Sequence, residues 1–195
     1  MPQLDEKIHL PIIPFETAQE WRSWLSKNHQ NENGLWLKFY KKNSGYPTVT
    51  YKEAVDEALC FGWIDGQSQS LDELAYLQRF TPRRAKSIWS KINTEHVARL
   101  VKEGKMDPAG LAQVEAAKKD GRWQKAYSSP ANMKIPDDFL KELEKQPKAK
   151  AFFKTLSKTN LYAIGYRLET AKKPETRERR MKIILEMLNN EEKFH

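Results

Sequence analysis

The sequence predicts an α+β protein: a small antiparallel sheet with packed helices in the N-terminal part, followed by an all-helical C-terminal part. Two observations support this fold class. Before residue 130, short runs of aliphatic and aromatic residues bounded by glycine and proline alternate with stretches of helical periodicity. From Ile135 onward, only helical periodicity remains. We therefore expect an α+β domain over residues 1–130 and a helical C-terminal subdomain over residues 131–195.

Helix caps and turn residues delimit the elements of the first part. Thr17, Thr50, Thr94 and Asp107 stand at N-cap positions, and Glu53 completes a capping box with Thr50. The expected elements are helices over 18–28, 51–61, 95–103 and 108–119, and strands over 35–40, 63–64 and 74–81, with a tight turn at Asp65-Gly66.

Proline positions delimit the helices of the second part. Pro136, Pro147 and Pro174 each stand at the start of an expected helix, where the missing N–H costs nothing. Ser157 or Thr159 is the expected cap of another helix, and the last helix is expected to end at Asn189. The segment 123–136 is expected to be a loop that links the two parts.

Composition excludes several classes of protein. The chain of 195 residues has 39% hydrophobic residues, enough for a core, and a net charge of +8. It has no apolar run of the roughly 20 residues needed to span a bilayer, and its N-terminus lacks the pattern of a secretory signal. Cys60 is its one cysteine and the four histidines lack metal-ligand spacing. We therefore expect a cytoplasmic protein with no metal and no cofactor, whose charge suits an anionic partner.

The run Cys60–Gly66 holds the first candidate site residues. Trp63 and Asp65 are two positions apart, so in a strand they face the same side and would grip a planar or cationic group. The alternative is that Trp63 fills the core and Asp65 forms the turn. Cys60 is a small buried side chain in one interpretation and a nucleophile in another, which would need a nearby base such as His96.

The run Arg79–Asn93 holds the second set. Five cations lie between Arg79 and Lys91, and no acidic residue occurs from Leu74 to Thr94. Arginine offers a planar fork to phosphate or carboxylate, serine adds neutral donors, and tryptophan stacks on planar groups. The alternative is a solvated basic loop with Trp89 in the core. The predicted ligand-binding residues are Trp63, Asp65, Arg79, Arg83, Arg84, Ser87, Trp89, Lys91 and Asn93, with Trp123 covering the site.

Five segments carry a family resemblance: EALCFGWIDG (57–66), RFTPRRAKSIWSKIN (79–93), GKMDPAG (104–110), DGRWQKAY (120–127) and AKKPETRERR (171–180). Together they resemble the YdeI/OmpD-associated (OmdA) family of bacterial proteins, over about Phe15 to Leu188. The resemblance implies protection against bacteriocins and cationic antimicrobial peptides in association with an outer-membrane porin, and no established reaction or cofactor. It also implies a periplasmic location, which does not fit a chain without a signal peptide.

We therefore expect a non-catalytic binding protein for an anionic or planar small ligand, with a role in stress or antimicrobial-peptide resistance. One alternative is an enzyme of unknown reaction, with Asp65 as general base and Arg83 holding an oxyanion. Another is sequence-independent nucleic-acid binding along the same basic stretch. The lack of a recognisable Ser, His and Asp arrangement favours binding over catalysis, and the shortness of the basic segment favours a small ligand over a polymer.

Overall fold

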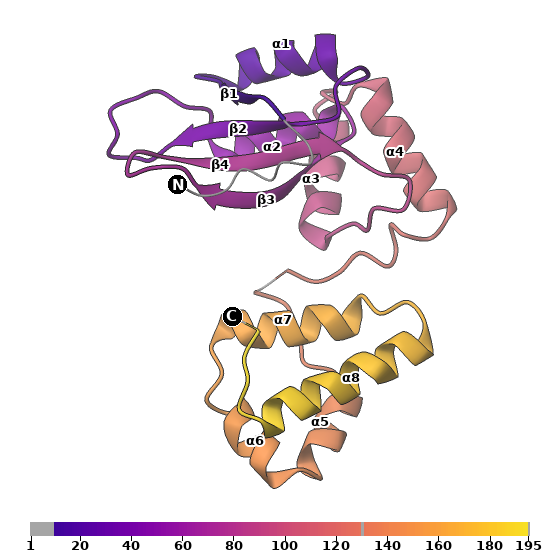
Figure 1. Ribbon diagram of the computed structural model, residues 1–195. Helices are drawn as coiled ribbons and strands as arrows, with labels where there is room; N and C mark the ends of the chain where they lie inside the picture. Colours follow the sequence, from indigo (N-terminus) through magenta and orange to yellow (C-terminus); the bar gives the residue numbers. More distant parts are fainter. Residues whose placement is uncertain (1–9, 130, 195) are drawn as a thin grey trace. The chain divides into compact units, whose positions relative to one another are not determined.

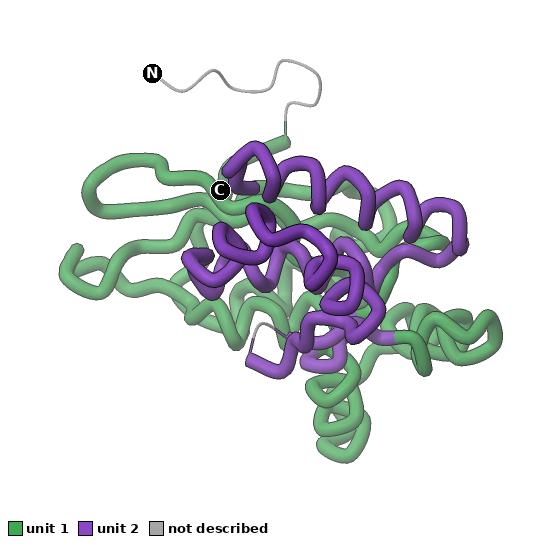
Figure 2. The backbone as a smooth tube through the Cα atoms, turned by 90° about the horizontal axis from the view of Figure 1, so that it is seen from below, with its two compact units in different colours: residues 1–89, 93–125 green, residues 90–92, 126–195 purple. Residues whose placement is uncertain are grey.

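The computed structural model describes residues 10–129 and 131–194, and it confirms the α+β class (Figure 1). The chain forms two compact units: residues 1–89 with 93–125, and residues 90–92 with 126–195 (Figure 2). The first unit contains the sheet, and the second unit is helical. All six tryptophans of the chain lie in the first unit.

The sheet has four strands in the order β1-β2-β4-β3. The pairs β2 with β4 and β3 with β4 are antiparallel, as expected, whereas β1 runs parallel to β2. Strand β1 was not expected, because its three residues follow Pro11, end in Pro14 and show no alternation of apolar and polar side chains. The strands are β1 (Ile12–Pro14), β2 (Leu35–Tyr40), β3 (Trp63–Ser70) and β4 (Ala75–Pro82).

Strand β3 is longer than expected. It does not turn at Asp65-Gly66 but continues to Ser70, with a bulge between Asp65 and Ser68 that absorbs the glycine. The turn to β4 lies after Leu71, where the Oδ1 atom of Asp72 accepts the backbone N–H of Ala75 at 2.7 Å. The pair Asp65-Gly66, which favours a turn in the sequence, therefore lies at a bulge within the strand.

The helices of the first unit are α1 (Ala18–Asn28), α2 (Tyr51–Cys60), α3 (Lys91–Lys102), whose first residues belong to the second unit, and α4 (Pro108–Lys119). Three caps are confirmed: Thr17, the Thr50–Glu53 capping box and Asp107. The Thr50 hydroxyl and N–H hold the pKa of the Glu53 carboxyl below its ordinary value. The cap predicted at Thr94 is wrong because α3 already begins at Lys91, whose N–H donates to the carbonyl of Tyr127 at 2.9 Å.

Aromatic side chains join α1 to the sheet. The rings of Trp21 and Phe80 lie 5.6 Å apart, and those of Trp21 and Trp63 lie 6.3 Å apart. The indole N–H of Trp21 donates to the carbonyl of Ala54 in α2 at 3.1 Å, so no polar atom of this ring is left unsatisfied in the core. Leu59 of α2 completes this core and is 1% exposed.

Helices α2 and α4 approach closely where α2 ends. The N–H of Asp107 donates to the carbonyl of Cys60 at 3.1 Å. A Cβ atom at Gly110 would lie 2.1 Å from that same carbonyl oxygen. Gly110 is therefore the residue that permits this crossing.

The second unit contains α5 (Asp137–Glu144), α6 (Pro147–Phe153), α7 (Lys158–Glu169) and α8 (Pro174–Asn189). Arg177 of α8 ties the unit together, because it donates to both carboxylate oxygens of Asp138 at 2.6 and 2.7 Å and to the carbonyl of Leu168 at 3.0 Å. The buried core comprises Phe139, Leu143, Ala149, Ile164, Leu168, Ile184, Leu185 and Leu188. None of the described helices is long and apolar enough to cross a membrane.

Candidate functional site

The predicted basic segment becomes a loop between β4 and α3. Strand β4 ends at Pro82, and the N–H of Arg83 donates to the carbonyl of Gly62 at 2.9 Å, which carries the pairing with β3 one residue further. The loop then runs over residues 83–90 to the start of α3. Its base is therefore anchored to the sheet.

Inside the loop, a cation lies on an aromatic ring. The guanidinium carbon of Arg83 lies 3.5 Å from the centroid of the Trp89 ring, and the ring of Trp123 lies 5.0 Å from that of Trp89. Arg83 is 6% exposed and Trp89 is 1% exposed. A desolvated cation–π pair of this kind contributes about 2 kcal/mol. The cluster of Arg83, Trp89 and Trp123 stabilises the loop from within.

The tip of the loop is a closed turn. The N–H of Ser87 donates to the carbonyl of Arg84 at 2.9 Å, and the Ser87 hydroxyl accepts the N–H of Arg84 at 3.1 Å. Arg122, which also pairs with Asp120 at 2.7 Å, donates to the carbonyl of Ser87 at 2.8 Å. This contact places the segment after α4 beside the turn.

Exposed cations gather on both segments that this contact joins. Arg84 and Lys86 are exposed at the loop tip, and three lysines are exposed at the end of α4 and after it. The Nζ atom of Lys118 lies 5.9 Å from the centroid of the half-buried Trp123 ring. We call this the basic surface: Arg84, Lys86, Lys118, Lys119, Trp123 and Lys125.

Trp63 and Asp65 lie elsewhere in the first unit. The indole of Trp63 is 1% exposed, and its N–H donates to the carbonyl of His29 at 3.1 Å in the core. The Oδ2 atom of Asp65 accepts the Tyr51 hydroxyl at 2.6 Å. The carboxylate of Asp65 and the buried guanidinium of Arg83 thus engage different partners, which gives no support to a shared catalytic cleft.

Arg79 is half-buried on the face of the sheet opposite to Phe80. It pairs in register with Trp36, and its neighbour Phe80 faces the core. Its Nε atom lies 3.2 Å from the position that a Cβ atom would take at Gly66, so the missing side chain there makes room for the guanidinium.

Lys91 and Asn93 lie in the first turn of α3 rather than ahead of it. The ammonium of Lys91 donates to the Ser128 hydroxyl at 3.2 Å, and that hydroxyl donates to Glu169 at 3.0 Å. The ten predicted residues are therefore spread over several places. Of them, the structure brings together Arg83, Arg84, Ser87, Trp89 and Trp123, and their role as a binding site stays a prediction.

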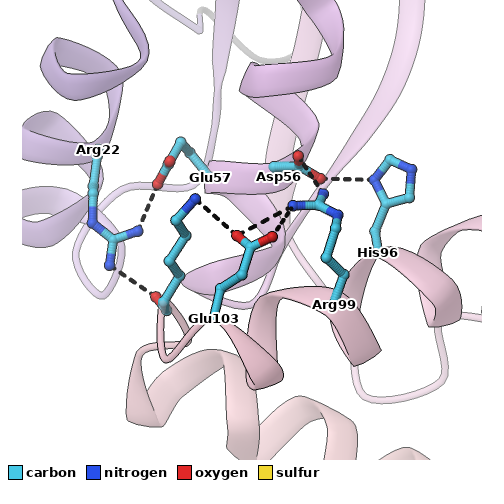
Figure 3. A network of polar contacts seen from close by, with 7 residues as sticks. Arg22, Asp56, Glu57, His96, Arg99 and Glu103 are labelled. Atoms are coloured by element: carbon cyan, nitrogen blue, oxygen red, sulfur yellow. Dashed lines mark hydrogen bonds and ion pairs between the residues drawn. The ribbon is translucent and has the colours of Figure 1, made fainter.

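A polar network that the sequence did not predict joins residues of α1, α2 and α3 (Figure 3). Asp56 on α2 pairs with His96 Nδ1 at 2.7 Å and with Arg99 Nη2 at 2.5 Å, both on α3. A second arm joins Arg22 of α1 to Glu57 at 2.6 Å. The helical spacing of His96 and Arg99, and the acidic pair of α2, are signals for this network, but their pairing across helices is tertiary information.

Cys60 is not an activated nucleophile. Burial raises the pKa of its thiol from 9.0 to about 11, and a hydrogen bond with Arg22 lowers it only in part. The nucleophilic thiolate is therefore a negligible fraction of the folded protein at neutral pH. Among the described residues, no group of three or more His, Cys, Asp and Glu is arranged to hold a metal ion.

Comparison with protein families divides the chain in two. A family model described as "Domain of unknown function (DUF8412)" matches residues 13–113, and one described as "Bacteriocin-protection, YdeI or OmpD-Associated" (OmdA) matches residues 132–191. The expected OmdA resemblance is thus confirmed for the C-terminal helices, whereas the first three of the five segments fall within the other match and segment 120–127 lies between the two matches. No curated protein and no solved structure is significantly similar to the chain.

Proposed function

The chain belongs to the family described as a domain of unknown function (DUF8412), with an OmdA-like C-terminal segment, and from this premise we propose that it is a non-catalytic binding protein. Its ligand is anionic and contacts the basic surface. One observation carries the proposal: two exposed cations, Arg84 and Lys86, stand on a turn held in place by buried contacts. A preorganised turn loses little conformational entropy when it binds.

The chemistry of the basic surface suits phosphate or carboxylate groups. Arg84 offers a planar pair of donors, and the lysines add point charges. The half-buried ring of Trp123 lies among them and supplies a face on which a planar group stacks. A nucleotide combines both features and is the best first probe.

Titration calorimetry with ATP and other nucleotides at low salt tests the proposal. We expect the Arg84→Ala/Lys86→Ala variant to bind at least about tenfold more weakly, since two exposed charge-assisted contacts are lost. The Lys42→Ala/Lys52→Ala variant is the matched control, because it removes two exposed cations outside the loop and changes the net charge equally. Equal affinities of the two variants would contradict the proposal.

Nucleic acid is the second candidate. The cations stand on an exposed loop tip and on the end of a helix rather than inside a closed cavity, which also suits a polymer backbone. Single-stranded oligonucleotide binding that weakens steeply with salt would favour this candidate. Nucleotide binding without measurable oligonucleotide binding would exclude it.

The family description supports a physiological proposal. The OmdA model is described by bacteriocin protection, and we place this chain in resistance to stress or antimicrobial peptides, acting in the cytoplasm. Bacteria that express the wild-type chain should survive bacteriocin exposure better than bacteria that express the Arg84→Ala/Lys86→Ala variant. Cell fractionation tests the location, and recovery in the periplasmic fraction would refute that part.

A further inference from the structure

A groove of about 660 Å³ runs along α8 in the second unit. Its floor is apolar, because Met181 and Leu185 line the groove and also belong to or pack on the helical core. Asn189 at one end of α8 donates to the amide oxygen of Gln146, which joins α8 to the start of α6 at the groove. The volume lies within the range of small-molecule sites, about 300–1,000 Å³.

The spacing of the charged residues along α8 determines the shape of the groove. Glu178, Lys182 and Glu186 recur every four residues, so they lie along one side of the helix beside the apolar floor. At 1.5 Å per residue, Glu178 and Glu186 are about 12 Å apart along the axis. The groove is therefore elongated, with a carboxylate at two separated points.

The groove is acidic, in contrast to the chain as a whole. Three carboxylates line it, those of Glu142, Glu178 and Glu186, against the one ammonium of Lys182. Glu142 pairs with Lys145 at 2.7 Å. Within residues 10–129 and 131–194, the side chains of Glu178 and Glu186 have no ion-pair partner, although the net charge of the chain is +8. Two negative charges beside an apolar floor are thus available to a ligand.

This pattern selects one ligand chemistry. An anion is repelled by the two carboxylates that have no ion-pair partner. A single metal ion cannot span the two carboxylates of α8, because metal–oxygen bonds are about 2.0–2.6 Å long. A flexible chain of methylene groups can pack on the apolar floor. Ammonium groups at separated points along the same chain can pair with the two carboxylates.

We propose that this groove binds a linear aliphatic polyamine of the spermidine class. Its methylene groups lie over Met181 and Leu185, and its ammonium groups contact Glu178 and Glu186. The site is independent of the basic surface, which takes ligands of the opposite charge.

Titration calorimetry of spermidine into the full chain at low salt tests the inference. We expect saturable binding at one site. The Glu178→Gln/Glu186→Gln variant should bind roughly tenfold more weakly, since two exposed charge contacts with the ammonium groups are lost. The Glu175→Gln/Glu192→Gln variant, which removes two carboxylates outside the groove lining, should bind as the wild type does. The Arg84→Ala/Lys86→Ala variant should also bind spermidine normally, which separates this inference from the proposed function.

Four results would overturn the inference. They are the absence of spermidine binding, equal weakening in both glutamate variants, displacement of spermidine by an equal charge concentration of Mg²⁺, and binding of a lysine-rich peptide where spermidine does not bind. The last result would assign the groove to a protein partner. Putrescine, a shorter diamine that cannot reach both carboxylates, should bind more weakly than spermidine.

Discussion

Replacement of Gly110 by alanine tests the close crossing of α2 and α4. The added Cβ atom would lie 2.1 Å from the carbonyl oxygen of Cys60 and 2.7 Å from its carbon, whereas ordinary contacts begin at 3.4 Å. Both atoms belong to the backbone, so no rotation of a side chain relieves the overlap. The two helices must move apart, which also strains the hydrogen bond from Asp107 to Cys60.

The size of the effect follows from two opposing terms. Overpacking of a core costs typically 1–3 kcal/mol, and an overlap with backbone belongs at the upper end, about 3 kcal/mol. Alanine is better than glycine within a helix by about 1 kcal/mol. We therefore expect Gly110→Ala to lower the free energy of unfolding by about 2 kcal/mol.

Urea unfolding followed by far-UV circular dichroism measures this change through the midpoint and slope. Gly165→Ala is a matched control in helix α7, because its Cβ atom would lie 2.5 Å from Met133 Cγ, in a flexible side chain. We expect that variant to stay within about 1 kcal/mol of the wild type, as the methionine moves aside. A Gly110→Ala protein as stable as the wild type, or less affected than Gly165→Ala, would refute the close crossing.

The remaining predictions concern stability, reactivity and domain organisation. Arg83→Lys should cost about 1–2 kcal/mol in urea unfolding, because lysine does not stack on the ring of Trp89 as a planar guanidinium does; an unchanged midpoint would show that the stacking adds nothing. Because the pKa of the Cys60 thiol is raised, the thiol keeps its proton at higher pH in the folded state than in the unfolded state. The stability that the buried thiol contributes is therefore full below pH 9.0 and is lost as the pH rises to about 11. At about pH 8 a thiol reagent should therefore label the chain only in denaturant, and rapid labelling of the folded protein would contradict the burial of Cys60. Thr50→Ala should lose about 1 kcal/mol by removing the cap of α2, whereas Thr50→Ser should lose far less because it keeps the hydroxyl; equal losses would exclude the capping role. Limited trypsin digestion tests the predicted division near residue 130: first cleavage at Lys125 or Lys134 agrees with it, and first cleavage within α5–α8 does not.

Local signals in the sequence were sufficient for most elements. The caps at Thr17, Thr50 and Asp107 gave the starts of α1, α2 and α4, because an N-cap acts on neighbouring backbone groups. The start of α3 escaped prediction because it depends on a contact with Tyr127, 36 positions along the chain. Strand β1 escaped for the same reason, since its three residues become a strand only beside β2.

In the candidate site, too, the features that depend on contacts between distant parts of the chain escaped prediction. Residue types alone indicated a basic and aromatic loop, and the loop exists. They did not indicate that Arg83 lies under Trp89 while Arg84, the next residue, is exposed. The acidic groove was also missed, because Glu142 and Glu186 become neighbours only when the helices pack.

The confinement of all six tryptophans to the first unit gives the protein a built-in optical label. Intrinsic fluorescence excited at the indole band reports on residues 1–89 and 93–125 alone, whereas the helical unit contributes only tyrosine emission from Tyr127, Tyr162 and Tyr166. Unfolding curves from indole emission and from circular dichroism will coincide if both units melt together and separate if they do not. The cooperativity of the two units is therefore measurable on the unmodified chain, without a probe or a mutation.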